Sequence, residues 1–477
     1  MTIRTLLVST PGAVWNRFQS KNRMRQILHV QGLCGGWLAM ALADPAPRSP
    51  HLPLKIKEVP KLPATLRALQ YPNFQLFFSG QLISLIGTWM QNLAQPWLVY
   101  RLTGSMVLLG GISFCSQFPI FLLSTLGGIV ADRYSRHRVV IATQTLSMLL
   151  ALILAGLTLS HRVHIWHIFV LSALLGAVNA FDIPARQAFI VEMVARPDLM
   201  NAIALNSSMF NASRVVGPAI AGILVAAIGE GWCFFANGIS YIAVIIGLLL
   251  MHVAPTERQA NLASPLANII EGFRFVIRNR PIHALLILLG IASITGMPFQ
   301  VLMPVFADRI IHGGPKALGW LTGCAGMGAL GAALLLASRQ TLKGLSVWVA
   351  ASSTAFGVGL IVFSASRSFL FSAIVLVPVG FAMMLAMGST NTLIQSMVPD
   401  ELRGRVMGVY SMVMMGMAPF GGLLAGLVAD RLGAPLTVTI GGVVCLIAAI
   451  VFSTQLPGIR VHMRLMIAKQ RQTVADK

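Results

Sequence analysis

The sequence predicts an all-α membrane protein with twelve transmembrane helices in two six-helix halves. Three observations lead to this fold class: an apolar composition, twelve long apolar runs, and loops whose basic residues are unevenly distributed. Hydrophobic residues make up 56% of the 477 residues, and charged residues only 10%. Because a soluble domain carries about 25% charged residues, a chain this poor in charge needs lipid around it.

Each apolar run is long enough to cross a bilayer, which takes about 20 residues as a helix. The first six runs lie at 74–100, 107–131, 139–159, 165–183, 203–228 and 232–253. The last six lie at 283–307, 317–337, 345–365, 369–396, 406–429 and 435–455. The predicted domains are therefore an amino-terminal half at 67–253, a cytoplasmic linker at 254–280, a carboxy-terminal half at 281–456 and a cytoplasmic tail at 457–477.

Basic residues set the expected orientation. With both termini in the cytoplasm, the inner loops between spans hold 13 Lys and Arg and the outer loops hold 6, as the positive-inside rule requires. The net charge of +21 is thus explained by a bacterial cytoplasmic membrane, and no nucleic-acid partner is expected. The linker contains a short amphipathic pattern at 269–277, which predicts a helix on the membrane surface.

Residues 1–66 are expected to form a disordered cytoplasmic tail. Basic residues between Arg17 and Arg25 precede an apolar stretch at 32–43, which is also the pattern of a signal peptide. An upstream start codon that adds residues without a function is a further alternative. The tail is favoured over the signal peptide because the first span already serves as an insertion signal.

A glycine- and arginine-rich segment between the second and third spans is the strongest motif. Its key residues are Gly127, Gly128, Asp132, Arg133, Arg136 and Arg138. Small residues let helices touch, an acid at the membrane edge suits a helix N-terminus, and arginines bind carboxylates. The segment resembles the signature of the major facilitator superfamily, except that Ser135 stands where the family usually has Gly. The resemblance implies an inner gate; the alternative is an arginine cluster that only sets topology.

Two further charged motifs follow. Asp182, Arg186 and Glu192 are predicted at the inner mouth, in a loop where Pro184 ends or kinks the fourth helix. We expect Asp182 to pair with Arg136, and Arg186 to pair with Glu192 or Asp132. The alternative is a solvated loop with unpaired charges.

The fifth span contains Asn211 and Arg214, followed by Gly217, Pro218 and Gly222. This stretch resembles, in degenerate form, the antiporter motif of drug–proton exporters. Because a charge inside a span is costly, Arg214 is expected to line the central cavity and to respond to protons or substrate. The alternative is a shallower arginine that snorkels to the interface.

Softer polar signals complete the candidate site. Gln91 and Gln95 on the first span, and Asn391 and Gln395 on the tenth, either line the cavity or bond helix to helix. The outer triplets Ala-Asp-Arg at 307–309 and 429–431 favour local Asp–Arg pairs over an outer gate.

Residues 66–455 resemble the branch of the superfamily that contains the enterobactin exporters and related proton antiporters. Segments that carry this resemblance include 72–74, 184–189, 206–211, 217–218 and 403–406. The resemblance implies export. We expect a monomeric secondary active transporter that exports a drug-like, siderophore-like or metabolite molecule by alternating access, with the proton gradient as its energy source. The many methionines favour a permissive, fairly apolar pocket.

The alternative function is a proton-coupled importer, or symporter, of the same fold. A membrane receptor or enzyme is a remote alternative, because the sequence has no zinc-protease motif, phosphate-binding loop or paired cysteines. No enzyme activity, metal site or cofactor is expected. The partners that we expect are the bilayer and the transported molecule.

Overall fold

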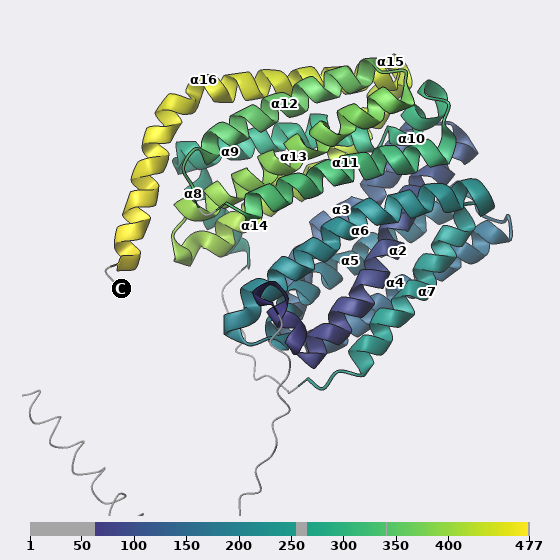
Figure 1. Cartoon of the computed structure of the whole chain (residues 1–477), viewed down its shortest axis with the longest axis horizontal. Coiled ribbons are helices and arrows are strands. Elements are labelled where there is room, and N and C mark those ends of the chain that lie inside the picture. The colour runs from purple at the N-terminus through teal and green to yellow at the C-terminus, as the bar shows by residue number, and fades with distance from the viewer. Residues whose placement is uncertain (1–62, 254–264, 340, 476–477) are drawn as a thin grey trace, which may run out of the picture. The chain divides into compact units, whose positions relative to one another are not determined.

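A computed structural model describes residues 63–253, 265–339 and 341–475 of the chain. Most of the predicted tail 1–66 and part of the predicted linker, 254–264, lie outside the described residues. The described residues form helices and contain no strand (Figure 1). The expected all-α fold is therefore confirmed.

Two sets of helices follow one another along the chain. The first half consists of α2 (Pro72–Thr103), α3 (Met106–Arg133), α4 (Arg136–Leu159), α5 (Ile165–Met193), α6 (Leu199–Ile228) and α7 (Glu230–Leu249). The second half consists of α9 (Arg280–Ile291) with its continuation to Ile310, α11 (Gly314–Ala337), α12 (Leu345–Ala365), α13 (Phe369–Met397), α14 (Asp400–Gly416), α15 (Ala418–Leu432) and α16 (Ala434–Ala475). α8 (Pro265–Arg278) lies between the halves in sequence.

Eleven helical stretches of the described chain are long and apolar enough to cross a membrane. α2 is the twelfth crossing helix: it has 32 residues, but polar side chains such as Gln81 and Gln91 lower its hydropathy. Both glutamines are buried inside the protein, so lipid does not have to solvate them. Apolar side chains face outward instead, for example Leu146, Leu149 and Ile153 of α4.

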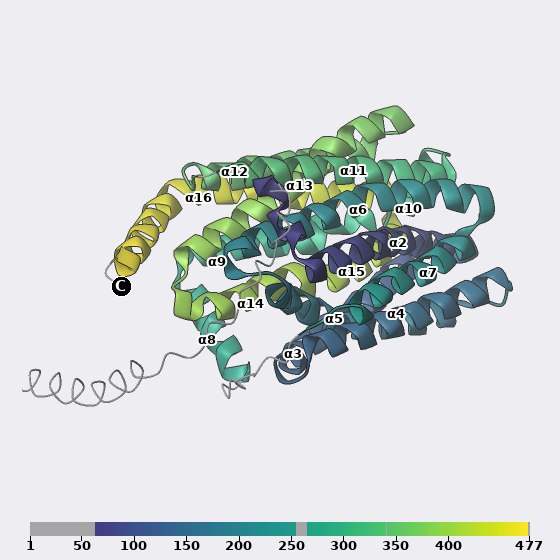
Figure 2. The ribbon, with the colours of Figure 1, turned by 60° about the horizontal axis from the view of Figure 1, so that its bottom comes forward.

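The two halves repeat one pattern of helix packing (Figures 1 and 2). In the first half α3 packs on α5, and α4 packs on α5 and α7. In the second half α11 packs on α13, and α12 packs on α13 and α16. Contacts between the halves are reciprocal as well, because α6 packs on α11 and α15 packs on α3. This is the arrangement expected of two parallel repeats.

The loops gather at two ends of the bundle. The basic end, where most loop Arg and Lys residues lie, holds α8 and the loops 134–135, 194–198, 338–344 and 398–399. The far end holds the loops 104–105, 160–164, 311–313, 366–368 and 433.

Near the far end the two halves touch backbone to backbone. A Cβ atom added to Gly222 of α6 would lie 2.8 Å from the Cα of Gly319 and 2.8 Å from the carbonyl oxygen of Pro315, both in α11. A Cβ atom added to Gly110 of α3 would lie 2.6 Å from the carbonyl oxygen of Gly422 in α15. Only glycine fits at these crossings, because any side chain would push the halves apart.

The seventh and eleventh spans, each predicted as one helix, are interrupted. After α9 the seventh span passes through a π-helical turn (Ala292–Gly296), a 3₁₀ turn (Met297–Gln300), α10 (Met303–Val305) and a second π-helical turn (Phe306–Ile310). Pro298 and Pro304 each remove a backbone donor in this stretch. Hydropathy does not reveal such breaks, because membrane helices tolerate proline and glycine.

Two helical elements at the basic end extend into the segments predicted as tails. The 3₁₀ helix η1 (Ala64–Gln70) is fixed to the α5–α6 loop, since Gln70 and Tyr71 donate to Asp198 at 2.9 and 2.8 Å. α16 continues as a helix through most of the predicted tail 457–477. α8 packs on α14, where Arg405 forms an ion pair with Glu271, while its Ile270 and Ile277 remain exposed.

Replacing Gly222 by Val should prevent the halves from closing at the far end. We expect normal membrane insertion and a transport rate at least tenfold lower than that of the parent, because the α6–α11 crossing has no room for a side chain. Gly156→Val is the matched control, since a Cβ atom there meets nothing within 4 Å. Equal transport by the Gly222 and Gly156 variants would contradict the role of this crossing.

Candidate functional site

Arg136 connects three helices at the basic end. Its guanidinium lies 3.2 Å from the Glu192 carboxylate of α5 and 3.7 Å from the Asp132 carboxylate of α3. It also donates to the backbone carbonyl oxygens of Ala188, at 3.1 Å, and Ala131, at 3.3 Å. The start of α4 is thereby tied to the ends of α3 and α5.

Asp182 is a buried carboxylate of α5, with an exposed fraction of 2%. Its Oδ2 lies 3.2 Å from Arg186 Nε, and its Oδ1 accepts hydrogen bonds from Thr143 at 2.7 Å and Gln144 at 2.9 Å, both in α4. Three donors therefore compensate for the loss of water around this charge.

This pairing differs from the expected one, in which Asp182 would meet Arg136. The reason is that α5 does not end at Pro184 but continues to Met193. Residues four apart in a helix share one face, so Asp182 meets Arg186 within α5. Arg136 then pairs with Glu192.

Of the other residues in the glycine- and arginine-rich motif, one packs between helices and the rest face open space or solvent. A Cβ atom on Gly127 would lie 2.0 Å from the carbonyl oxygen of Ala180, so this glycine lets α3 touch α5. Gly128 has open space around it. Arg133 and Arg138 are exposed.

No ion pair within the described residues joins the gating motif to the second half. The pairs at the basic end lie within the first half, within α14, or between α8 and α14. The Asp132 side chain is 66% exposed to solvent, so its ion pair with Arg136 contributes little free energy. The inner gate therefore stays a prediction, and in this structure the motif acts within one half.

The antiporter-like segment of α6 serves two helix contacts. At Gly217 an added Cβ atom would lie 2.5 Å from the Cβ of Trp89, so this glycine makes room for α2. The carbonyl oxygen of Pro218 and Gly222 both face Gly319 of α11. The motif residues thus connect α6 to its own half and to the other half.

Arg214 lies in the same helix and stacks on an aromatic side chain. Its guanidinium carbon is 5.8 Å from the centre of the Trp89 ring, which meets Phe210 edge to face at 5.5 Å. In the described parts of the chain, none of the ion pairs involves Arg214. Asn211 is buried and donates to the carbonyl oxygen of Ser207, a bond inside α6.

The glutamines of α2 bond helix to helix. Asn237 of α7 donates to Gln91 at 2.7 Å, Gln91 to Gln95 at 3.4 Å, and Gln95 to Ser172 of α5 at 2.5 Å. All four side chains are buried, so Gln91 and Gln95 are bonded inside the first half. In the second half, Gln395 is exposed and donates to Asn391 of its own helix at 2.5 Å.

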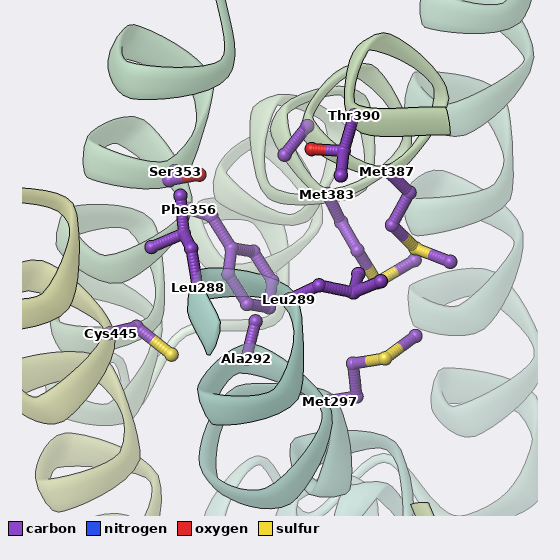
Figure 3. Close-up of a pocket in the computed structure, with 11 residues that line it drawn as sticks. Leu288, Leu289, Ala292, Met297, Ser353, Phe356, Met383, Met387, Thr390 and Cys445 are labelled. Atoms are coloured by element: carbon purple, nitrogen blue, oxygen red, sulfur yellow. The ribbon is translucent and has the colours of Figure 1, made fainter. Parts of the chain in front are cut away.

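The second half contains a small, partly open cavity of about 30 Å³ that the sequence motifs did not identify (Figure 3). Three methionines, Met297, Met383 and Met387, line it together with Phe356 and Thr390. The high methionine content was the one sequence signal for it. Flexible, polarizable methionine side chains suit a surface that adapts to different apolar groups.

A polar contact at the far end was also missed. Arg309 of the second half donates to the carbonyl oxygen of Gly104 at 3.1 Å and lies 5.6 Å from the centre of the Tyr100 ring, both in the first half. We expected a local Asp–Arg pair at this triplet. Instead, Arg309 joins the halves.

Comparisons with known proteins support a transporter. A family model described as transmembrane secretion effector matches residues 64–471. The chain is 29% identical to the staphyloferrin A transporter of Staphylococcus aureus, over 79% of this chain and 94% of that protein. It is 27% identical to the multidrug efflux pump Tap of Mycolicibacterium fortuitum, over 73% and 87%. It is 23% identical to the enterobactin exporter EntS of Shigella boydii, over 72% and 81%.

Asp182→Asn and Asp132→Asn should separate stability from transport. Removing the buried charge leaves Arg186 without its partner, so we expect about 3–5 kcal/mol of destabilisation and a clearly lower melting temperature in detergent. Asp132→Asn should cost less than about 1 kcal/mol, because its pair is exposed, yet it should abolish most transport if the motif gates. Equal melting temperatures of the two variants would argue against the buried network, and unchanged transport by Asp132→Asn would remove Asp132 from the gate.

Proposed function

The chain belongs to the transmembrane secretion effector family of the major facilitator superfamily, and we propose that it exports a small molecule from the bacterial cytoplasm by alternating access, as a proton antiporter. Membership of this family makes it a secondary transporter rather than an enzyme. The proposal places the basic end and both termini in the cytoplasm, as the distribution of basic residues favours.

The contact pattern between the halves carries the proposal. Near the far end the halves touch at Gly222–Gly319 and Gly110–Gly422, and Arg309 reaches across to Gly104. At the basic end, the ion pairs of the described residues do not connect the two six-helix sets. With the basic end inside, glycine contacts near the far end would suit a conformation that receives substrate from the cytoplasm, which is the state we propose.

Proton coupling needs a titratable side chain inside the protein, and we propose the buried carboxylate of Asp182 as the candidate. It lies 11 residues before the end of α5, which is about 16 Å along the helix axis. Protonation would weaken its pair with Arg186 and change the contact between α5 and α4. A proton taken up at this site would thus alter the packing of the first half.

Import by proton symport is the alternative function, and direction of transport decides between the two. The names of two relatives, a multidrug efflux pump and an enterobactin exporter, favour export for this chain as well. The name of the third, a staphyloferrin A transporter, gives no direction.

Inside-out membrane vesicles provide the test. With a respiration-driven proton gradient, we expect vesicles that contain the chain to accumulate at least one compound from a panel of siderophores and antibiotics. A protonophore should abolish the accumulation, because the gradient supplies the energy. Vesicles without the chain are the control.

Proton-driven accumulation in right-side-out vesicles only would establish the importer instead. Accumulation that survives the protonophore would refute proton coupling while leaving export intact. A reporter fused after Lys477 should be active only in its cytoplasmic form, and an external carboxyl terminus would overturn the orientation.

A further inference from the structure

Arg214 is a charge in the middle of a membrane span. It lies 15 residues after Leu199 and 14 residues before Ile228, the two ends of α6. At 1.5 Å per residue, the two ends are about 22 and about 21 Å away along the helix axis. An arginine side chain does not reach that far, so Arg214 cannot place its charge in water beyond either end of the helix.

The guanidinium has no hydrogen-bond acceptor among the described residues. The two most buried carboxylates of the spans are already engaged, Asp182 by Arg186 and Glu230 by Arg101 at 2.7 Å. A guanidinium presents five N–H donors, and Trp89 satisfies none of them through its ring face. The Arg214 side chain is only partly exposed, so its unpaired guanidinium is largely withdrawn from water.

Helical geometry shows on which face of α6 Arg214 lies. Successive residues are about 100° apart, so Ile223, nine residues on, lies on the opposite face of α6 from Arg214. Ile223 is exposed, as expected for a lipid-facing side chain. Arg214 instead shares its face with Pro218 and Val225, which lie on the side of α6 that packs on its neighbours.

α6 packs on α2 and α11, with Gly217 against Trp89 of α2 and Gly222 against Gly319 of α11. The backbone carbonyl of Arg214 lies 3.1 Å from the position of a Cβ atom on Gly326 of α11. Gly326 is the glycine of α11 closest to the basic end that approaches α6 in this way. The backbone of α6 at Arg214 therefore lies against α11, at the border between the two halves.

We propose that Arg214 and Trp89 form a subsite that binds a carboxylate or similar oxyanion of an amphipathic transported compound. The planar guanidinium would bind the anion through two parallel hydrogen bonds. Trp89, held against α6 by Gly217, fixes the guanidinium and offers an apolar surface to the rest of the molecule. This inference rests on the proposed transport function and deepens it by naming the substrate class, an organic anion.

Dansylglycine and dansylglycinamide are suitable probes, because they differ only in carboxylate against carboxamide. Their binding to the full chain in lipid nanodiscs can be measured by dansyl fluorescence. We expect the parent to bind dansylglycine at least tenfold more tightly than the amide. Arg214→Gln should abolish this preference and Arg214→Lys should keep part of it. The matched control is Arg162→Gln, which removes an exposed far-end arginine and should leave the preference unchanged.

Competition on the parent protein keeps the proposal testable should Arg214→Gln fail to fold. Benzoate should displace dansylglycine, and benzamide should not. Equal binding of the two probes by the parent, binding of neither, or an unchanged preference in Arg214→Gln would overturn the anion subsite. Because binding is measured without flux, vesicles that export while the parent shows no anion preference would refute the subsite alone. Anion preference without export would refute the proposed function alone.

Discussion

The whole arrangement depends on main chain meeting main chain where the two halves cross. In lipid there is no hydrophobic driving force between two apolar helices, so van der Waals contacts at close approach have to hold them together. At the α6–α11 and α3–α15 crossings, Gly222, Gly319, Gly110 and Gly422 provide that approach. A contact that consists of backbone atoms has few side-chain rotamers to rearrange, so it can form and separate repeatedly as a unit.

Polar groups are distributed unequally between the two equivalent halves. The first half contains the buried Asp182 network, the chain of amides from Asn237 to Ser172, and Arg214. The second half presents methionines and Phe356 around its small cavity. The buried charges and the methionine-lined cavity thus lie in different halves. The two halves thus share one pattern of helix packing but carry different side chains in their interiors.

Composition and periodicity were sufficient for the helical fold, because lipid leaves few alternatives for an apolar run of this length. Composition and periodicity gave wrong or open predictions where the partner of a side chain lies on another helix. Pro184 reads as a helix end, yet packing of Ala185 and Phe189, both fully buried, carries α5 past it and so changes the partner of Asp182. Likewise, Gln91 has the same sequence pattern whether it faces a cavity or Asn237. Arg309 could not be assigned to Gly104, since no sequence pattern encodes a contact between halves.

α16 is far longer than a bilayer is thick. Its 42 residues span about 63 Å, whereas the hydrocarbon core measures about 30 Å. Its internal proline, Pro457, comes 23 residues after Ala434, or about 35 Å, close to where the helix must leave the hydrocarbon. α16 bends in Figures 1 and 2, as helices do at proline. Past that point the sequence carries Arg460, Arg464, Lys469 and Arg471, so the part of α16 that exceeds the length of a span is also its basic part.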